Sequence, residues 1–316
     1  MKVLVTGGAG FIGSHSAKRL IREGYEVVIV DNFNEYYDPE LKRARIDNLL
    51  SGTRFKLYEA DIADFESLRK IFQENKIDIV LHQAAQAGVR HSLQEPFVYE
   101  KSNLKGTLNV LECCKEFKVK KLVFASSSSV YGKRNKVPFS EEDRTDAPVS
   151  LYAATKKAAE VMCYSYHSLY KISMVGLRYF TVYGPWGRPD MALFGFTDKI
   201  LKGEPIDVYG ERNMKRDFTY IDDIVNGTVT ALEKDFDFEI FNLGYGNPFG
   251  LMEFIEMLEN ALNRKAKKNF LPMQKGDVPI TYADISKAKA NLDWEPKISL
   301  KEGIEKFVKW YKKYYK

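Results

Sequence analysis

The first half of the chain alternates short apolar, β-branched runs with stretches in which apolar residues recur every three or four positions. The first pattern is typical of buried parallel strands, and the second is typical of helices that cover a sheet. The predicted strands are Lys2–Thr6, Glu26–Asp31, Phe55–Glu59, Ile79–Leu81, Lys121–Ala125 and Ser173–Tyr179. The predicted helices are Phe11–Glu23, Pro39–Leu50, Phe65–Glu74, Val98–Phe117 and Leu151–Tyr170. The expected fold class is therefore α/β, with a doubly wound parallel sheet.

After about Tyr179 this alternation loosens, and proline and glycine become frequent, as in Gly-Pro-Trp-Gly-Arg-Pro at 184–189. Such a composition favours a second lobe that is built partly of loops. Further on, Ile224–Leu232 has the pattern of a helix and Ile240–Leu243 that of a strand, so we expect the chain to return to the first lobe. The predicted organisation is a lobe of residues 1–180, to which 218–247 returns, and a smaller α/β lobe of residues 181–316.

The charge of the chain does not indicate a nucleic-acid partner. There are 48 Lys and Arg residues against 43 Asp and Glu residues, which gives a formal net charge of +5. The segment 306–316 alone contains five lysines and no acidic residue, so the remainder of the chain is formally neutral. Apolar residues recur at helical spacing from Leu300 to Tyr311, which predicts a terminal helix with a solvated basic face.

Few residues of the chain are suited to a metal site or a membrane segment. The three cysteines are Cys113, Cys114 and Cys163, and they form neither a CxxC motif nor a cluster with histidines, so we expect no metal site and reduced thiols. The first apolar run is short and rich in glycine, unlike a signal peptide, and no later run is long enough to span a bilayer. We therefore expect a cytoplasmic protein without a membrane partner.

A glycine-rich turn connects the first predicted strand to the first predicted helix. Gly8, Gly10 and Gly13 satisfy the pattern G-x-G-x-x-G, in which glycines allow a tight turn and a close approach of the backbone to a pyrophosphate. The N-terminus of the following helix offers free N–H groups to the anion. Asp31 closes the second strand, where its carboxylate would bind ribose hydroxyls and repel a 2′-phosphate. These features predict a Rossmann domain that binds NAD rather than NADP.

A tyrosine and a lysine lie one helical turn apart in a helix that Ser150 is expected to cap. Tyr152 and Lys156 would share a face, and a nearby ammonium together with the NAD ring would lower the tyrosine pKa from its usual value of roughly 10. Tyr152 could then act as a base near neutral pH. A serine run at 126–129 follows a predicted strand, and the hydroxyl of Ser127 could share the substrate's proton with Tyr152.

Several further motifs point to a known family. They are TGGAGFIG at 6–13, DN at 31–32, QAAQAG at 83–88, Asn103, the serine run with the VYG that follows it, YAATK at 152–156, RYFTVYGP at 178–185, RDFTYIDD at 216–223 and KGDVP at 275–279. Over essentially its whole length the chain resembles the extended short-chain dehydrogenases/reductases, in particular their nucleotide-sugar epimerase branch. This resemblance implies a Rossmann domain, a smaller lobe for a nucleotide sugar, and a homodimer formed through helices near 98–117 and 151–170.

The motifs and the resemblance together predict the residues of the cofactor site. The expected contacts to tightly bound NAD are Gly7, Gly10, Phe11, Ile12, Gly13, Asp31, Asn32, Asp61, Ile62, Gln83, Ala84, Ala85, Gln86, Asn103, Tyr152 and Lys156. Asp61 and Ile62 follow the third strand and would face the adenine edge. The expected catalytic residues are Tyr152, Lys156 and Ser127.

The resemblance also reduces the number of reactions that the chain is expected to catalyse. Dehydratases and many decarboxylases of this branch have an acidic residue just before V-Y-G, where this chain has Ser128 and Ser129, so epimerisation is favoured. The segments 31–45 and 180–192 resemble UDP-glucuronate 4-epimerases, and Thr181 and Gln274 depart from galactose epimerases. The expected substrate contacts are Arg90, Ser127, Ser128, Ser129, Tyr152, Thr181, Arg188, Arg216 and Asp277.

By this resemblance, Ser128, Ser129, Thr181 and Arg188 would hold the substrate carboxylate, Arg216 the diphosphate and Asp277 the uridine ribose. For Arg90, phosphate binding and structural pairing both remain open. The implied function is the NAD-dependent C4 epimerisation of UDP-glucuronate to UDP-galacturonate through a transient 4-keto intermediate, with NAD regenerated in each turnover.

Other functions remain open at this point. One is a UDP-glucose or UDP-N-acetylglucosamine 4-epimerase, in which Arg188 would serve structure only. Two others are a UDP-glucuronate decarboxylase and a scaffold that binds NAD without catalysis. The scaffold is disfavoured because the chain retains Ser127, Tyr152 and Lys156. A protein that only binds NAD has no need of a tyrosine whose pKa is lowered to form a phenolate.

Overall fold

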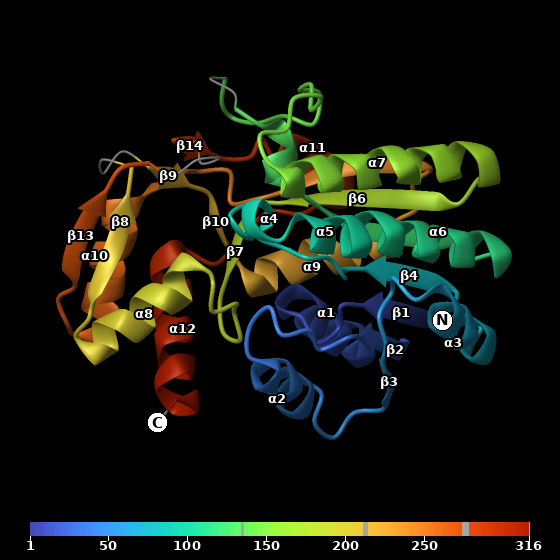
Figure 1. The fold of residues 1–316 in the computed structure, drawn as a ribbon, viewed down its shortest axis with the longest axis horizontal. Coiled ribbons are helices and arrows are strands. Elements are labelled where there is room, and N and C mark those ends of the chain that lie inside the picture. Colours follow the sequence, from blue (N-terminus) through green and yellow to red (C-terminus); the bar gives the residue numbers. More distant parts are fainter. Residues whose placement is uncertain (134–135, 211–213, 274–277, 316) are drawn as a thin grey trace.

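A seven-stranded sheet, parallel throughout, forms the larger part of the molecule (Figure 1). The computed structural model describes residues 1–133, 136–210, 214–273 and 278–315. The strands are β1 (Lys2–Thr6), β2 (Glu26–Asp31), β3 (Phe55–Glu59), β4 (Ile79–His82), β5 (Lys121–Ser127), β6 (Ser173–Tyr179) and β11 (Phe238–Leu243). Their spatial order is β11-β6-β5-β4-β1-β2-β3. The expected doubly wound α/β fold is confirmed.

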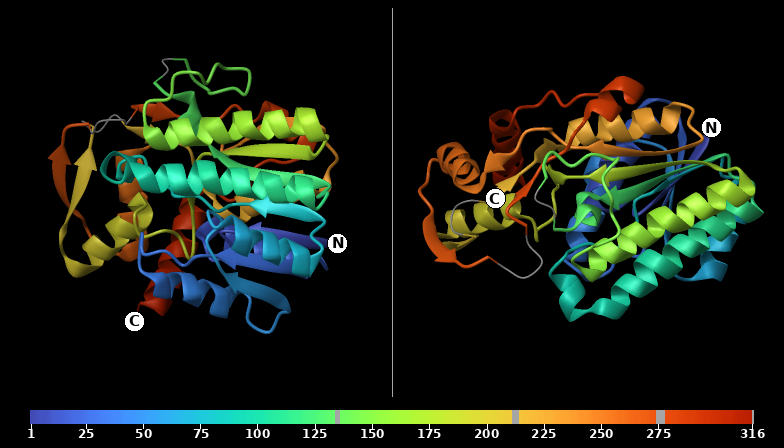
Figure 2. Two further views of the ribbon diagram at one scale, coloured as in Figure 1. Left: turned by 45° about the vertical axis from the view of Figure 1, so that its right-hand side comes forward. Right: turned by 90° about the horizontal axis from the view of Figure 1, so that it is seen from above.

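Alternate residues of each central strand face opposite layers of helices. In β1, Val3 and Val5 belong to one buried cluster and Leu4 to another, as the two-residue period of a strand requires. The helices α1 (Phe11–Arg22), α2 (Pro39–Leu49) and α9 (Ile221–Glu233) contribute to the first cluster. The helices α3 (Phe65–Asn75), α6 (Gly106–Glu116) and α7 (Leu151–Tyr170) contribute to the second (Figure 2).

The predicted helix 98–117 is not a single α-helix. It consists of α5 (Pro96–Tyr99), a π-helical turn at Glu100–Lys105 and α6, and a short α4 (His91–Gln94) precedes it. A Cβ at Gly106 would lie 2.6 Å from the Cδ1 atom of Ile62, so the side chain of Ile62 packs directly against this glycine. The apolar period of the sequence does not show such a local change of pitch, which often occurs near functional sites.

The carboxyl ends of the strands face a second group of elements. These are β7 (Thr181–Tyr183), α8 (Ala192–Lys202), β8 (Pro205–Tyr209), β9 (Lys215–Arg216), β10 (Phe218–Tyr220), β12 (Phe249–Gly250), α10 (Leu251–Leu262), β13 (Lys267–Leu271), β14 (Ile280–Thr281) and α12 (Leu300–Tyr314). The helix α11 (Ser286–Leu292) instead packs against α9 and β11 of the large sheet. The helix α12 buries its apolar stripe from Leu300 to Tyr311, as its sequence pattern predicts. The expectation of a partly looped lobe therefore understated its regular structure.

The chain returns to the large sheet after leaving it. The strand β11 pairs with β6 along its whole length, from Phe238 opposite Met174 to Leu243 opposite Tyr179. The helix α9, which precedes β11, packs against α1 on one face of the sheet. The division into lobes at residue 180 stays a prediction. Within the described part of the chain, no helix has both the length and the apolar character needed to cross a bilayer.

A buried ion pair supports the end of β5, where the serine run begins. Arg178 of β6 donates from Nε and Nη2 to the two carboxylate oxygens of Glu160 of α7, at 2.8 and 2.9 Å. Ser126 Oγ also donates to Glu160, at 2.7 Å. Burial opposes the charge on Glu160, but the hydrogen bonds and charge of Arg178 hold its pKa below the usual value. The pair thus connects α7, β5 and β6 below the serine turn.

We predict that Glu160→Ala destabilises the fold by about 3–5 kcal/mol, because it leaves the buried guanidinium of Arg178 without its counter-charge. Urea denaturation followed by circular dichroism measures this free energy of unfolding. The matched control is Glu116→Ala, which removes an exposed Arg–Glu pair with Arg69 and should leave stability nearly unchanged. Equal effects of the two substitutions would contradict the prediction.

Candidate active site

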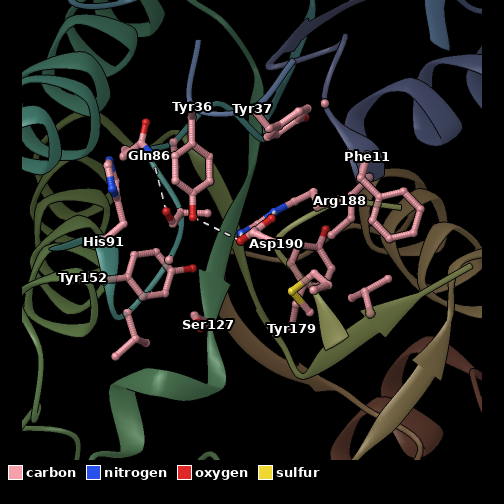
Figure 3. Close-up of a pocket in the computed structure, with 18 of the residues that line it drawn as sticks. Phe11, Tyr36, Tyr37, Gln86, His91, Ser127, Tyr152, Tyr179, Arg188 and Asp190 are labelled. Atoms are coloured by element: carbon pink, nitrogen blue, oxygen red, sulfur yellow. Dashed lines mark hydrogen bonds and ion pairs between the residues drawn. The ribbon is translucent and has the colours of Figure 1, made fainter. Parts of the chain in front are cut away.

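A cavity of about 990 Å³ opens between the carboxyl ends of the large sheet and the second group of elements (Figure 3). Every residue that the sequence analysis assigned to the site lines this cavity, apart from two. Asn103 lies behind the cavity wall, and Asp277, like Gln274, lies outside the described residues. Residues from the two halves of the chain therefore meet in one cavity, which suits a cofactor and a substrate that bind next to each other.

The glycine turn leaves room only for backbone. A Cβ at Gly13 would lie 2.2 Å from the carbonyl oxygen of Gly7, and a Cβ at Gly7 would lie 2.6 Å from the amide nitrogen of Ala84. The helix α1 begins after Gly10, which offers no side-chain cap, so the first N–H groups of the helix remain available to an anion. This geometry fits the pyrophosphate of a dinucleotide.

Two carboxylates lie at the carboxyl ends of the next two strands of the sheet, Asp31 at the end of β2 and Asp61 just after β3. Asp31 accepts hydrogen bonds from the N–H groups of Ala9 (3.0 Å) and Phe33 (2.9 Å), which leaves further lone pairs for ribose hydroxyls. Burial raises the pKa of Asp31, and these two bonds oppose that rise. Asp61 accepts from the Ala63 N–H at 2.9 Å and pairs with Lys101. These bonds outweigh the effect of burial and lower its pKa.

Asn103 forms hydrogen bonds to residues next to the cavity. Its Oδ1 atom accepts from the Gln86 N–H at 2.7 Å, and its Nδ2 atom donates to the Gln86 carbonyl and to Thr155 Oγ1, each at 3.0 Å. The side chain sits in the π-helical turn and joins the 83–88 loop to α7. In this structure Asn103 therefore positions Gln86, and the direct contact with the cofactor that the sequence analysis expected stays a prediction.

Tyr152 and Lys156 both line the cavity, from the first turns of α7. The predicted cap is present, since Ser150 Oγ accepts from the Ala153 N–H at 3.1 Å. Lys156 Nζ donates to the Ala125 carbonyl at 2.9 Å, and burial lowers its pKa to about 8. The hydroxyl of Ser127 lies at the end of β5, beside Tyr152.

The sequence analysis expected Lys156 together with the NAD ring to lower the pKa of Tyr152, and this lowering stays a prediction. In the structure, burial raises the pKa of Tyr152, while hydrogen bonding to Ser127 and the charge of Arg188 act in the opposite direction. Helical spacing gives the separation of two groups but not their loss of hydration. The resting phenol is therefore protonated near neutral pH.

Arg188 already has a carboxylate partner within the cavity. Its Nε atom donates to Oδ1 of Asp190 at 2.9 Å, and Tyr36 donates its hydroxyl to Oδ2 of Asp190 at 3.1 Å (Figure 3). Burial opposes ionisation of Asp190, but the charge and hydrogen bonds of Arg188 hold its pKa below the usual value. The sequence analysis missed Asp190 and Tyr36, although the spacing of Arg188 and Asp190 was visible.

The remaining predicted substrate residues lie on other walls of the cavity. Ser128 and Ser129 lie in a 3₁₀ turn, and the Ser129 N–H donates to Ser127 Oγ at 3.2 Å. The Arg90 guanidinium lies over the ring of Tyr209, 5.1 Å from its centroid. The other predicted positions are Thr181, at the start of β7, and Arg216, in β9.

A further residue that the sequence analysis missed is Arg45 of α2, which is fully buried. It donates to the Ala9 carbonyl (3.2 Å), the Trp186 carbonyl (2.9 Å) and the Gly187 carbonyl (3.2 Å), and also to the Tyr37 hydroxyl (2.6 Å). The guanidinium thus connects the glycine turn to the loop that carries Arg188. Its place four residues after Leu41 on the apolar stripe of the helix was the signal that could have revealed it.

Potential metal ligands do not converge anywhere in the described ranges, since no three His, Cys, Asp or Glu side chains form a group that could hold an ion. Besides the carboxylates of Asp31, Asp61 and Asp190, the cavity is lined by hydroxyls, arginines and backbone N–H groups. These further groups can donate hydrogen bonds, and donors suit an anionic ligand with phosphate and carboxylate groups.

The chain matches the model of the NAD dependent epimerase/dehydratase family over residues 3–244. It is 50% identical over 310 residues to the UDP-glucuronate 4-epimerase of Thermodesulfobacterium geofontis, covering 98% of this chain and 95% of that protein. A crystal structure of UDP-glucuronic acid 4-epimerase from Bacillus cereus, in complex with UDP-glucuronic acid and NAD, is 40% identical and superposes with a TM-score of 0.93 over 99% of both chains. UDP-glucose 4-epimerase from Thermotoga maritima with UDP-glucose is 35% identical, with a TM-score of 0.92 over 100% of both chains.

We predict that Gly13→Ala weakens NAD binding by about a hundredfold, or about 2.7 kcal/mol. The added methyl group would clash with the Gly7 carbonyl and force the turn apart. Titration of purified protein with NAD, followed by calorimetry, measures the affinity. As a control, Gly250→Ala adds the same methyl group at an N-cap with nothing closer than 3.9 Å. Unchanged affinity in Gly13→Ala would show that this turn does not hold the pyrophosphate.

Proposed function

Since the chain belongs to the NAD dependent epimerase/dehydratase family, we propose that it catalyses the C4 epimerisation of UDP-glucuronate to UDP-galacturonate. The observation that carries this proposal is a single cavity in which Tyr152 and Ser127 share space with Arg188, a cation suited to a sugar carboxylate. Relatives of 50% and 40% identity bear the name of this epimerase.

The residues present fit NAD. We assign the pyrophosphate to the glycine turn and α1, the adenosine ribose to Asp31 and Asn32, and the adenine edge to Asp61 and Ile62. NAD supplies a reversible two-electron oxidant for C4 when it is bound. Because the reaction leaves the substrate's oxidation state unchanged overall, one tightly held cofactor serves many turnovers.

In the proposed mechanism, Tyr152 acts as a phenolate once bound NAD and the Lys156 ammonium together favour its ionisation, and it then takes the proton of the C4 hydroxyl while C4 gives up its hydride and becomes a ketone. Ser127 shares this proton through its hydrogen bond with Tyr152. Lys156 would hold the cofactor ribose, and its ammonium would stabilise the negative charge of the Tyr152 phenolate. After the 4-keto ring has turned about its diphosphate link, Tyr152 returns the proton and C4 regains the hydride on its other face.

The carboxylate of the substrate needs a firm hold in each of the two ring orientations in which C4 gives up or regains its hydride. A 4-keto uronate is a β-keto acid, which loses CO₂ when its carboxylate aligns with the ketone π system. We assign the carboxylate to Arg188, Thr181, Ser128 and Ser129, none of which supplies an acid to protonate a carbanion at C5.

The nucleotide end of the substrate lies with the cationic groups of the second lobe. We assign the diphosphate to Arg216, and Arg90 stays open between phosphate binding and structural pairing. Arg216 Nη1 donates to the carbonyls of Lys215 and Pro279, which orients its side chain along the cavity wall. Asp277 remains the proposed contact of the uridine ribose by resemblance alone.

A second candidate is a UDP-glucose 4-epimerase. The observation that favours it is the pairing of Arg188 with Asp190, because a structural arginine would show the same contact. A structure of 35% identity also bears that name. Both candidates share the chemistry at C4 and differ in the group at C6, so a comparison of the two substrates separates them.

We predict that purified protein converts UDP-glucuronate to UDP-galacturonate with a kcat/KM at least about tenfold above that for UDP-glucose, a difference of about 1.4 kcal/mol. NMR of the reaction mixture identifies the products.

Tyr152→Phe should lower kcat by about a thousandfold with the fold intact, because it removes the acid–base group. Accumulation of UDP-xylose or preference for UDP-glucose would overturn the proposed substrate, and near-normal turnover by Tyr152→Phe would overturn its role.

We also propose a cytoplasmic location. Cys113, Cys114 and Cys163 are free and buried, which suits a reducing compartment. Burial raises the pKa values of these thiols, so they remain protonated and unreactive.

A homodimer is part of the same proposal. The helices α6 and α7 pack side by side (Figure 2). Both expose apolar side chains, among them Leu108 (42% exposed) and Val161 (57% exposed). Phe97 of α5 is 82% exposed beside them. A second copy of this surface would cover these side chains and form a four-helix bundle.

We predict that the double substitution Leu108→Lys and Val161→Lys converts the dimer to a monomer at micromolar concentration, because charged side chains would be buried at the interface. Sedimentation equilibrium measures the mass in solution. Leu57→Lys, on the edge strand β3, replaces a similarly exposed residue elsewhere and should leave the mass unchanged. A wild-type monomer would rule out the homodimer.

A further inference from the structure

The carboxylate of Asp190 occupies the donors that a uronate substrate needs. Both Nε and Nη2 of Arg188 point at Asp190, so the guanidinium fork is filled in the bidentate manner. The side chains of Arg188 and Asp190 are 24% and 30% exposed, and both line the cavity that contains Tyr152 and Ser127 (Figure 3). A second carboxylate that enters this cavity therefore meets an arginine that is already paired.

Asp190 is also held by a residue from a distant part of the sequence. Tyr36, in the loop between β2 and α2, donates its hydroxyl to Asp190 at 3.1 Å. The ring of Tyr36 packs against His91, with ring centroids 4.7 Å apart, and the Arg188 guanidinium lies 5.9 Å from the centroid of the Tyr36 ring. The loop that follows the NAD-binding strand β2 thus reaches the ion pair directly.

We propose that Asp190 is a specificity-determining residue, which pairs with Arg188 in the resting enzyme and exchanges that position with the carboxylate of the uronate substrate. This inference rests on the proposed function, because it takes the substrate to be a UDP-uronate. A neutral UDP-sugar leaves the Arg188–Asp190 pair intact. A uronate replaces one carboxylate by another, so the positive charge of Arg188 stays compensated throughout.

The exchange has opposite consequences for binding and for turnover. In the bound state Asp190 competes with the substrate for the Arg188 fork and thereby weakens the ground-state complex. When the 4-keto ring turns, the substrate carboxylate must leave that fork, and Asp190 can take the donors back. Asp190 therefore raises KM for a uronate and at the same time increases kcat, because it prevents Arg188 from holding the ring in one orientation.

Neutralisation of Asp190 separates these two effects. Asp190→Asn keeps the size of the side chain and removes its charge, so it should bind UDP-glucuronate about tenfold more tightly and lower kcat by about tenfold. The affinity for UDP-glucose should stay within twofold of wild type. Calorimetric titration of the NAD-loaded protein measures both affinities, and NMR of product formation gives kcat.

Two further variants complete the test. Asp198→Asn makes the same change outside the cavity, at Asp198 of α8, which pairs with Lys202 at 2.8 Å. It should leave the affinity for UDP-glucuronate and kcat within twofold of wild type. Tyr36→Phe removes the hydroxyl that holds Asp190 and should act in the same direction as Asp190→Asn, with a smaller effect.

The possible outcomes either support the exchange or overturn it. Weaker or unchanged binding of UDP-glucuronate by Asp190→Asn would show that Asp190 only orients Arg188, and equal changes for both UDP-sugars would exclude a role in specificity. The absence of UDP-galacturonate in the wild-type reaction would contradict the proposed function instead. In that case, the ratio of the UDP-glucuronate affinities of Asp190→Asn and wild type still shows whether the carboxylates of Asp190 and of the UDP-sugar compete for Arg188.

Discussion

The buried guanidinium of Arg45 is the contact on which the geometry of the cavity depends. It reaches the Ala9 carbonyl in the glycine turn and the Trp186 and Gly187 carbonyls in the loop before Arg188. A buried cation is costly unless its donors are satisfied, and here three carbonyls and the hydroxyl of Tyr37 satisfy them. The same bonds set the spacing between the cofactor turn and the substrate loop.

The loop that Arg45 holds has an unusual backbone. The Gly187 N–H donates to the Gly184 carbonyl at 3.1 Å, and Trp186 within this turn has a φ angle of +64°, where glycine is normally found. Such a conformation costs on the order of 1–3 kcal/mol. The bond from Arg45 to the Trp186 carbonyl and the packing of the indole ring against Trp310 and Tyr314 of α12 offset this cost.

The sequence predicted those features that are set by local pattern. The bounds of β1, β2, β3, β6 and α7 agree with the structure, because alternation, helical period and the Ser150 cap lie within short segments. The glycine turn was equally visible, since its function depends on residue type and spacing. The raised pKa of Tyr152 and the buried position of Asn103 were not predictable in this way, because burial arises from segments far apart in the chain.

Arg188 illustrates why a site has to be described from both the sequence and the three-dimensional structure. Its charge and its place in the 180–192 segment identified it from the sequence, but its direction is fixed by Arg45 through the backbone and by Asp190 through the side chain. Since Arg45 holds the carbonyls before Arg188, the guanidinium can change partner without movement of the loop. A site that must grip a carboxylate and also release it needs this combination of a fixed backbone and an exchangeable ion pair.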